Sequence, residues 1–96
     1  MTNSNTTDKY KCLSGYLGGQ GKFDRLPGKR KKKTLDVMIE YLGDKFDKNK
    51  EYTEIEVNVI LCQYHSFNDP ATLRRLLFGS NILNRTRDGR RYWRIP

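Results

Sequence analysis

The chain has 96 residues, 35% of them hydrophobic, and a formal net charge of +8, which indicates one small domain without a large cofactor-filled interior. Its two cysteines, Cys12 and Cys62, are too few for a disulfide framework, and no Cys/His pair has the spacing of a zinc site. No apolar run reaches the roughly 18 residues that span a membrane, and the start MTNSNTTDKY lacks a signal peptide's apolar core. We therefore expect a cytoplasmic protein with no membrane partner. We also expect no cofactor and no small-molecule substrate.

The charge is distributed unevenly along the chain. Residues 1–33 contain nine Lys/Arg and two acids, residues 34–69 contain three and eight, and residues 70–96 contain seven and one. Two basic ends therefore flank an acidic middle. This pattern predicts a bipolar domain with one face directed toward a polyanion.

The first 28 residues are predicted to lie outside the main domain. Residues 1–9 are rich in Asn, Ser and Thr and are predicted to form a disordered tail. Residues 10–28 are predicted to form an N-terminal arm with a short helix that ends at Gly18. The helix is indicated by apolar residues at helical spacing: Tyr10, Leu13, Tyr16 and Leu17.

The first main helix is predicted from about Lys29 to Phe46, with Gly43 or the following DKNK loop at its end. Its apolar residues fall on one stripe, which we expect in the core: Leu35, Met38, Ile39, Leu42 and Phe46.

The second helix has the clearest local signature in the chain. Thr53 and Glu56 have the spacing of a capping box, and Tyr52 and Val57 have the spacing of a hydrophobic staple. The predicted buried stripe consists of Val57, Ile60, Leu61 and Tyr64.

The third helix is predicted to begin with Asp69 as its cap and Pro70 as its first residue. The preceding HSFND segment is short enough for the steep crossing of a helix-turn-helix unit, which puts this helix in the recognition position. With Leu73, Leu76 and Leu77 facing inward, Ala71 and Arg75 point outward and Thr72 and Arg74 lie on the flanks.

A basic hairpin is predicted to close the chain. The segment ILNRTRDGRRYWRIP combines strand-forming residues with Asp88–Gly89, a pair that tolerates positive φ. Tyr92 and Trp93 fall on opposite faces of their strand, so one should pack on the helices. Before the hairpin, Asn81 is a candidate for a left-handed residue that ends the third helix.

The predicted fold class is mainly α with a C-terminal β-hairpin (α+β), as a winged helix-turn-helix over residues 29–96. The leading hypothesis is a small DNA-binding transcriptional regulator, with double-stranded DNA as partner, whose third helix enters the major groove while the hairpin arginines bind phosphates. The basic residues at the start of the first helix would either contact the DNA phosphate backbone or be exposed to solvent only. The candidate nucleic-acid-binding residues are Lys29, Arg30, Lys31, Lys32, Lys33, Thr72, Arg74, Arg75, Arg85, Arg87, Arg90 and Arg91.

Alternatives remain open from the residues alone. Glu54 or Glu56 could pair with either Arg74 or Arg75 inside the fold; Arg75 is assigned to recognition, and Arg74 to a structural role or to phosphate contact. The second hypothesis is a protein-interaction or ligand-sensing module without nucleic acid, which would have the arginines in intramolecular pairs and an exposed apolar patch. RNA binding shares the charge argument, and a homodimer formed through the N-terminal arm fits either function.

Catalysis has little support in the sequence. His65 is the only histidine, and it lies at a helix end, where a capping role is expected rather than acid-base chemistry. There is no Gly-rich phosphate loop and no nucleophile elbow. We therefore expect no enzyme activity and no catalytic residue or metal site.

From Phe23 to Arg94 the chain resembles a bacterial domain family of unknown function. The segments that show the resemblance are KFDRLPGKRKKK, YLGDKF, EYTEIEVNVIL, DPATLRRLL and LNRTRDGRRYWR. Members of that family are found alone or fused behind the DNA-binding domain of a transcriptional regulator. The resemblance implies a winged-helix-like fold and a link to transcription regulation, but no ligand or catalytic residue. Where the family usually has glycine before the first strand of the hairpin, this chain has Asn81.

Overall fold

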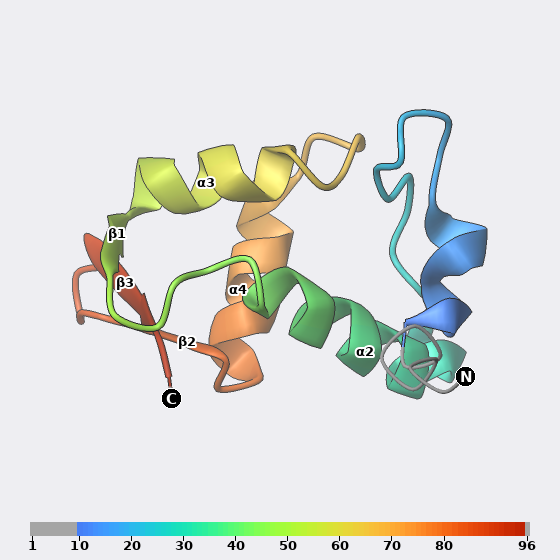
Figure 1. Cartoon of the computed structure of the whole chain (residues 1–96). Coiled ribbons are helices and arrows are strands. Elements are labelled where there is room, and N and C mark those ends of the chain that lie inside the picture. Colours follow the sequence, from blue (N-terminus) through green and yellow to red (C-terminus); the bar gives the residue numbers. More distant parts are fainter. Residues whose placement is uncertain (1–9, 96) are drawn as a thin grey trace, which may run out of the picture.

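The computed structural model describes residues 10–95, so the predicted tail at residues 1–9 lies outside the described residues. The fold is α+β, with a small sheet at one end and the N-terminal arm at the other (Figure 1). Its elements are η1 (Lys11–Tyr16) and η2 (Lys29–Lys31), both 3-10 helices, α2 (Lys32–Gly43), β1 (Glu51–Thr53), α3 (Glu54–Cys62), α4 (Pro70–Gly79), β2 (Leu83–Arg85) and β3 (Arg91–Arg94). No described helix has the length and apolar character needed to cross a membrane.

The three main helices form where the periodicity predicts them. On α2, Met38, Ile39 and Leu42 are buried, and the helix ends at Gly43. Phe46 is also buried, but it lies in the turn after α2 and not in the helix. The start differs slightly from the prediction, because Lys29–Lys31 form a single 3-10 turn before the α-helix begins.

Both predicted N-caps are present. Thr53 accepts a hydrogen bond from the Glu56 backbone N–H at 3.1 Å, and the Glu56 carboxylate accepts one from the Thr53 N–H at 2.8 Å. The carboxylate of Asp69 accepts from the Thr72 N–H at 3.2 Å, with Pro70 at the first position of α4. Asn81 has φ of 60°, so the predicted left-handed residue after α4 is confirmed.

The sheet has three strands, whereas the sequence predicted a two-stranded hairpin. The hairpin of β2 and β3 is confirmed, but β1 pairs antiparallel with β3 and makes the strand order β1-β3-β2. Tyr52 lies opposite Tyr92, and both side chains are buried. Trp93, on the other face, is half-buried, so Tyr92 is the residue that packs on the helices.

The N-terminal arm shares the core of the remaining chain. Leu13 and Phe23 are 3% and 2% exposed and belong to the same buried cluster as the helix residues. Phe23 also exchanges backbone hydrogen bonds with the segment after α3, donating to the Tyr64 carbonyl at 2.8 Å and accepting from the Ser66 N–H at 2.9 Å. The helix predicted from residue 10 onward is a 3-10 helix, η1, and the arm folds back onto the domain.

His65 joins α3 to α4 through both of its ring nitrogens. Nδ1 lies 2.7 Å from the Leu61 carbonyl oxygen, and Nε2 accepts the Asp69 backbone N–H at 2.9 Å. Because Nε2 accepts, the hydrogen is on Nδ1 and donates to Leu61. His65 is 3% exposed, so it has the expected helix-terminal role and fixes the crossing of α3 and α4.

Candidate nucleic-acid interface

The candidate interface is built from α4 and the hairpin that follows it. The start of α4 is held by Asp69, which also accepts the Thr72 hydroxyl hydrogen at 2.7 Å. Hydrogen bonds from the Thr72 hydroxyl and backbone N–H lower the pKa of the Asp69 carboxyl below its ordinary 3.8. The hydroxyl hydrogen of Thr72 is therefore used inside the helix cap, and only the oxygen lone pairs of this half-buried residue are available to a ligand.

Arg74 is tied into the fold. Its guanidinium donates to the Asn58 side-chain oxygen and lies 3.5 Å from the Glu54 carboxylate, and its side chain is only 15% exposed. The structure therefore gives Arg74 the α3–α4 packing role that was the alternative to phosphate contact.

Arg75 and Arg85 line a common pocket between α4 and the hairpin. The pocket has a volume of about 230 Å³ and is also lined by Phe78, Gly89 and Tyr92. The guanidinium carbon of Arg85 lies 4.8 Å from the centre of the Phe78 ring, a cation–π distance. A Cβ atom built on Gly89 would lie 3.0 Å from Arg85 Nη1, so the guanidinium packs against both the Phe78 ring and a residue without a side chain.

Arg75 is exposed at the outward face of α4 and has no ion pair among the contacts found over residues 10–95. Arg75 lies one helical turn after Ala71 on the same outward face of α4, as the helical spacing predicts.

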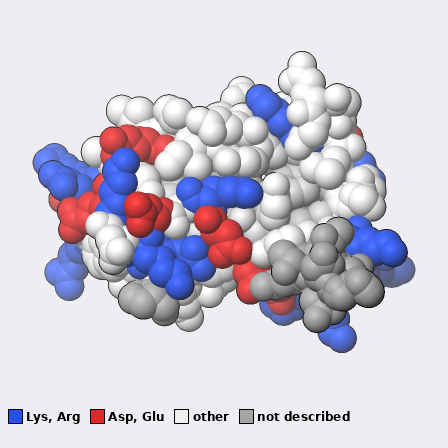
Figure 2. All heavy atoms as spheres, viewed as in Figure 1, with Lys and Arg blue, Asp and Glu red and all other residues white. Residues whose placement is uncertain are grey.

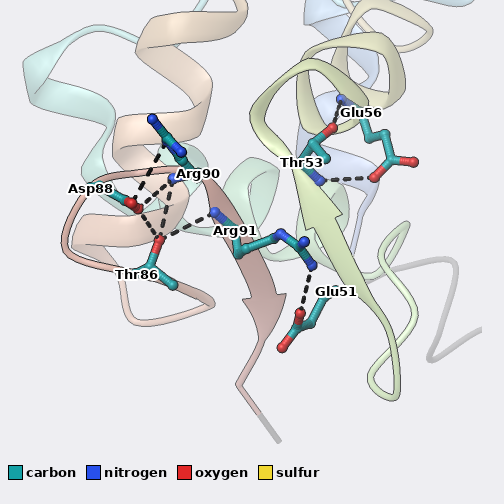
Figure 3. A network of polar contacts seen from close by, with 7 residues as sticks. All are labelled: Glu51, Thr53, Glu56, Thr86, Asp88, Arg90 and Arg91. Carbon is teal, nitrogen blue, oxygen red and sulfur yellow. Dashed lines mark hydrogen bonds and ion pairs between the residues drawn. The ribbon is translucent and has the colours of Figure 1, made fainter.

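The turn of the hairpin contains the predicted Asp88–Gly89 pair and is a four-residue loop, Arg87–Arg90, closed by a hydrogen bond from the Thr86 N–H to the Arg91 carbonyl at 3.0 Å. The Gly89 N–H donates to the Thr86 carbonyl at 3.0 Å, and only Gly89 has positive φ, at 72°. Inside the loop the Thr86 hydroxyl donates to Asp88 at 2.7 Å and accepts from the backbone N–H groups of Arg90 and Arg91 at 3.2 and 3.3 Å (Figure 3).

Hydrogen bonds within the hairpin turn also stabilise the ionised form of the Asp88 carboxyl. The Thr86 hydroxyl and the Arg90 backbone N–H lower the pKa of the Asp88 carboxyl below its ordinary 3.8. The loop is therefore ordered by a negatively charged group at the tip of a hairpin that is otherwise basic.

The arginines of the hairpin differ in how many carboxylates they meet. Arg91 donates to Glu51 of β1 at 3.2 Å, and Arg90 lies 3.8 Å from Asp88 (Figure 3). Arg87 is exposed and has no ion pair among the described residues. Arg94, which was not among the candidates, is 16% exposed and is bound by the Gly43 carbonyl at 2.8 Å and the Asp44 carboxylate at 3.2 Å.

The lysine-rich segment does not join this surface. Lys29 to Lys33 are exposed, but η2 and the start of α2 lie at the end of the molecule opposite the hairpin (Figure 1). Only Lys32 of this segment reaches toward the end of α4, where it lines a hollow with Gly79 and Arg94. The two basic ends of the sequence thus form two separate groups, and the single polyanion face predicted from the charge distribution is not formed.

A comparison with protein families covers most of the described residues. A family model described as an uncharacterized protein conserved in bacteria (DUF2087) matches residues 22–94. The chain belongs to the DUF2087 family. No curated protein and no solved structure matches it.

The segment matched by the DUF2087 model runs from just before Phe23 to Arg94 and includes every described element except η1. Within it, three carboxylates lie between the arginines of the candidate site: Glu54, whose pairing the sequence left open, and Glu51 and Asp88, which sequence reasoning missed. Figure 2 shows acidic and basic side chains interspersed at the sheet end of the molecule. Glu51 is distant from the hairpin in sequence, and its place depends on the unpredicted pairing of β1 with β3. The two hollows beside the hairpin are lined by six arginines and these three carboxylates, which leaves a net charge of +3.

Proposed function

We propose that this DUF2087 chain is a winged helix-turn-helix domain that binds double-stranded DNA as a small transcriptional regulator. The proposed motif consists of α3 and α4 as the helix pair, with the β2–β3 hairpin as the wing. Support comes from the order of the elements and from the short connection between α3 and α4, which His65 bridges.

The observation that carries the proposal is the convergence of Arg75 and Arg85 on one pocket between helix and hairpin. A guanidinium that is already held in place loses little side-chain entropy when a phosphate binds, and its planar donors match phosphate oxygens. In the proposed complex α4 approaches the major groove with Ala71 and Arg75 outward, while Arg85, Arg87 and Arg90 contact the backbone beside it.

The proposed set of DNA contacts is smaller than the set predicted from the sequence. Arg74 and Arg91 are removed because they lie 3.5 and 3.2 Å from carboxylates, and Lys29–Lys33 because they lie toward the opposite end of the molecule (Figure 1). Arg90 is kept, because its distance to Asp88 is 3.8 Å and its side chain is 85% exposed. About four phosphate contacts remain, which predicts a loss of roughly 100-fold in affinity between about 50 and 200 mM salt. The carboxylates near the wing oppose nonspecific binding, so a modest affinity is expected at physiological salt.

A titration of fluorescently labelled random duplex DNA by anisotropy tests the proposal. Arg75→Ala and Arg87→Ala should each weaken binding and reduce the salt slope by about one unit. Arg30→Ala is the matched control, because it removes the same charge at the far end and should leave the affinity within about twofold of wild type. Absence of binding at 50 mM salt, or equal losses in all three variants, would refute the proposed interface. Stronger competition by structured RNA than by duplex DNA would assign the surface to RNA instead.

A further inference from the structure

The hydroxyl of Tyr92 is a buried polar group that the fold leaves unused. Tyr92 is 4% exposed and lies opposite Tyr52, which is 5% exposed, on the two neighbouring strands β3 and β1. The Tyr52 hydroxyl accepts a hydrogen bond from the Asp47 backbone N–H at 2.7 Å. Among residues 10–95 the Tyr92 hydroxyl has no hydrogen-bond partner. Because buried tyrosine hydroxyls usually have a partner, this one indicates a group from outside the chain.

The Tyr92 side chain lines the pocket between α4 and the hairpin. Its oxygen is not sealed in the core, because the only fully enclosed side-chain polar atom without a partner in the described residues is Nε of Arg94. A Cβ atom built on Gly89, which also lines the pocket, would lie 3.9 Å from the Tyr92 oxygen. The pocket volume of about 230 Å³ is below the roughly 300 to 1,000 Å³ of sites for drug-sized molecules, so a smaller ligand group is expected.

The charges at the pocket favour an anion. The lining includes three arginines and two carboxylates, which gives a net charge of +1. Arg74 is compensated by Glu54 at 3.5 Å. Neither Arg75 nor Arg85 has an ion pair among the described residues, so both guanidinium groups have donors available to a ligand.

Two carboxylates near the pocket weaken this attraction. Asp88 lines the pocket, but its carboxylate accepts from the Thr86 hydroxyl at 2.7 Å and from the Arg90 N–H at 3.1 Å inside the hairpin loop (Figure 3). Asp69 at the start of α4 interacts electrostatically with Arg75 without forming an ion pair. We therefore expect the pocket to bind a small anion weakly.

We propose that this pocket binds a single phosphate group, with the Tyr92 hydroxyl and the guanidinium groups of Arg75 and Arg85 as hydrogen-bond donors. The three donors come from three elements, β3, α4 and β2. A phosphate group can offer a separate oxygen to each of them, whereas a carboxylate has only two oxygens. The Phe78 ring, 4.8 Å from the guanidinium carbon of Arg85, holds that donor at the pocket.

The phosphate group can come from the DNA backbone or from a free phosphate compound, because both present the same oxygens. The assignment to the DNA backbone rests on the proposed function. The pocket itself does not, since inorganic phosphate is a sufficient probe.

Titration of the full chain with inorganic phosphate at constant ionic strength, followed by ¹H–¹⁵N NMR, tests the pocket. We expect a saturable shift of the Gly89 amide and of the side-chain N–H signals of Arg75 and Arg85, which chloride at the same ionic strength does not produce. Arg85→Ala and Tyr92→Phe should each weaken phosphate binding about tenfold, since each removes a hydrogen bond to a charged group.

Tyr52→Phe is the matched control. It removes the hydroxyl of the equally buried tyrosine opposite Tyr92, so phosphate affinity should stay within about twofold of wild type while Tm falls. Tyr92→Phe should leave Tm without phosphate equal or higher, because no hydrogen bond within the described chain is lost. The absence of a saturable shift, or equal phosphate affinities of Tyr92→Phe and wild type, would overturn the site.

Competition with labelled duplex DNA identifies the source of the phosphate group. If phosphate displaces DNA more effectively than chloride does, and Tyr92→Phe weakens both ligands, the DNA backbone occupies the pocket. Phosphate binding by a chain that does not bind DNA at about 50 mM salt would keep the pocket, assign it to a free phosphate compound and refute the proposed function. DNA binding that Tyr92→Phe leaves unchanged, without phosphate binding, would refute the pocket and leave the proposed function intact.

Discussion

Gly43 and Gly79 offer a matched pair of substitutions whose effects on stability should have opposite signs. Each is the last residue of an α-helix, Gly43 in α2 and Gly79 in α4, and neither has positive φ. Helix propensity alone predicts that replacing either glycine by alanine stabilises the protein, by up to about 1 kcal/mol.

The tertiary structure reverses the prediction at Gly43. A Cβ atom there would lie 2.3 Å from Cγ2 of Ile82, whereas a Cβ at Gly79 meets nothing within 4 Å. Because Gly43 is buried and its carbonyl accepts from Arg94, the end of α2 cannot shift freely. Overpacking of this kind costs about 1 to 3 kcal/mol. After the gain in helix propensity, we expect Gly43→Ala to lower the free energy of unfolding by roughly 0.5 to 2.5 kcal/mol.

Urea and thermal unfolding followed by circular dichroism measure both variants. For a domain of this size each kcal/mol corresponds to about 4 to 8 °C, so Gly43→Ala should lower Tm by about 2 to 20 °C while Gly79→Ala leaves it equal or higher. Ile82→Ala removes the atom that the new Cβ meets, so the double variant should lose less stability than the sum of the two single variants. A Gly43→Ala protein as stable as wild type would show that the close approach of α2 and the residue before β2 is not as described.

Three further substitutions probe the caps and the hairpin. Thr53→Ala removes one half of the capping box and should lower the free energy of unfolding by about 1 kcal/mol in urea titrations, and an unchanged midpoint would contradict the cap. Thr72→Val removes the hydroxyl donor to Asp69, so the pKa of that carboxyl, lowered in the wild type, should rise toward 3.8 in a ¹³C NMR titration. A carboxyl whose pKa is lowered by folding stabilises the protein above its unfolded-state pKa, and that stability is lost as the pH falls through the folded-state pKa. Thr72→Val should therefore lose less of its stability on acidification than the wild type. A larger loss in acid would contradict the role of the Thr72 hydroxyl. Gly89→Ala combines positive φ with a Cβ 3.0 Å from Arg85 Nη1, so it should cost about 1 to 2 kcal/mol and weaken DNA binding, whereas Gly89→Asn should retain more stability because asparagine tolerates φ near 72°.

The three main helices and the starts of α3 and α4 could be predicted because their signals are local. Periodicity identified the buried residues of α2, and the positions of Thr53, Glu56 and Asp69 identified the starts of α3 and α4. These interactions join residues three or four positions apart, so the sequence brings them together whenever the helix forms. Asn81 was identifiable for the same reason, since its backbone conformation depends on its own side chain.

The candidate site was predictable only in part. Arg75, Arg85 and Arg87 lie on α4 and the hairpin as their spacing predicts, and a pair between Arg74 and Glu54 was among the alternatives left open, but nothing in the sequence indicated that Arg91 meets Glu51. Those pairs depend on β1 joining β3 and on the crossing of α3 and α4, contacts between residues 20 to 40 positions apart.

The amino-acid sequence alone determined which segments form the three main helices, where α3 and α4 start, and that a basic hairpin closes the chain. Only the folded chain decided which charges become neighbours, that Phe23 of the arm enters the core, and that η2 lies toward the end of the molecule opposite the β2–β3 hairpin (Figure 1). The physical reason is the sequence separation of the contacts. Helix periodicity and capping join residues within one or two helical turns, whereas strand pairing and ion pairs between elements depend on how distant segments pack around one core.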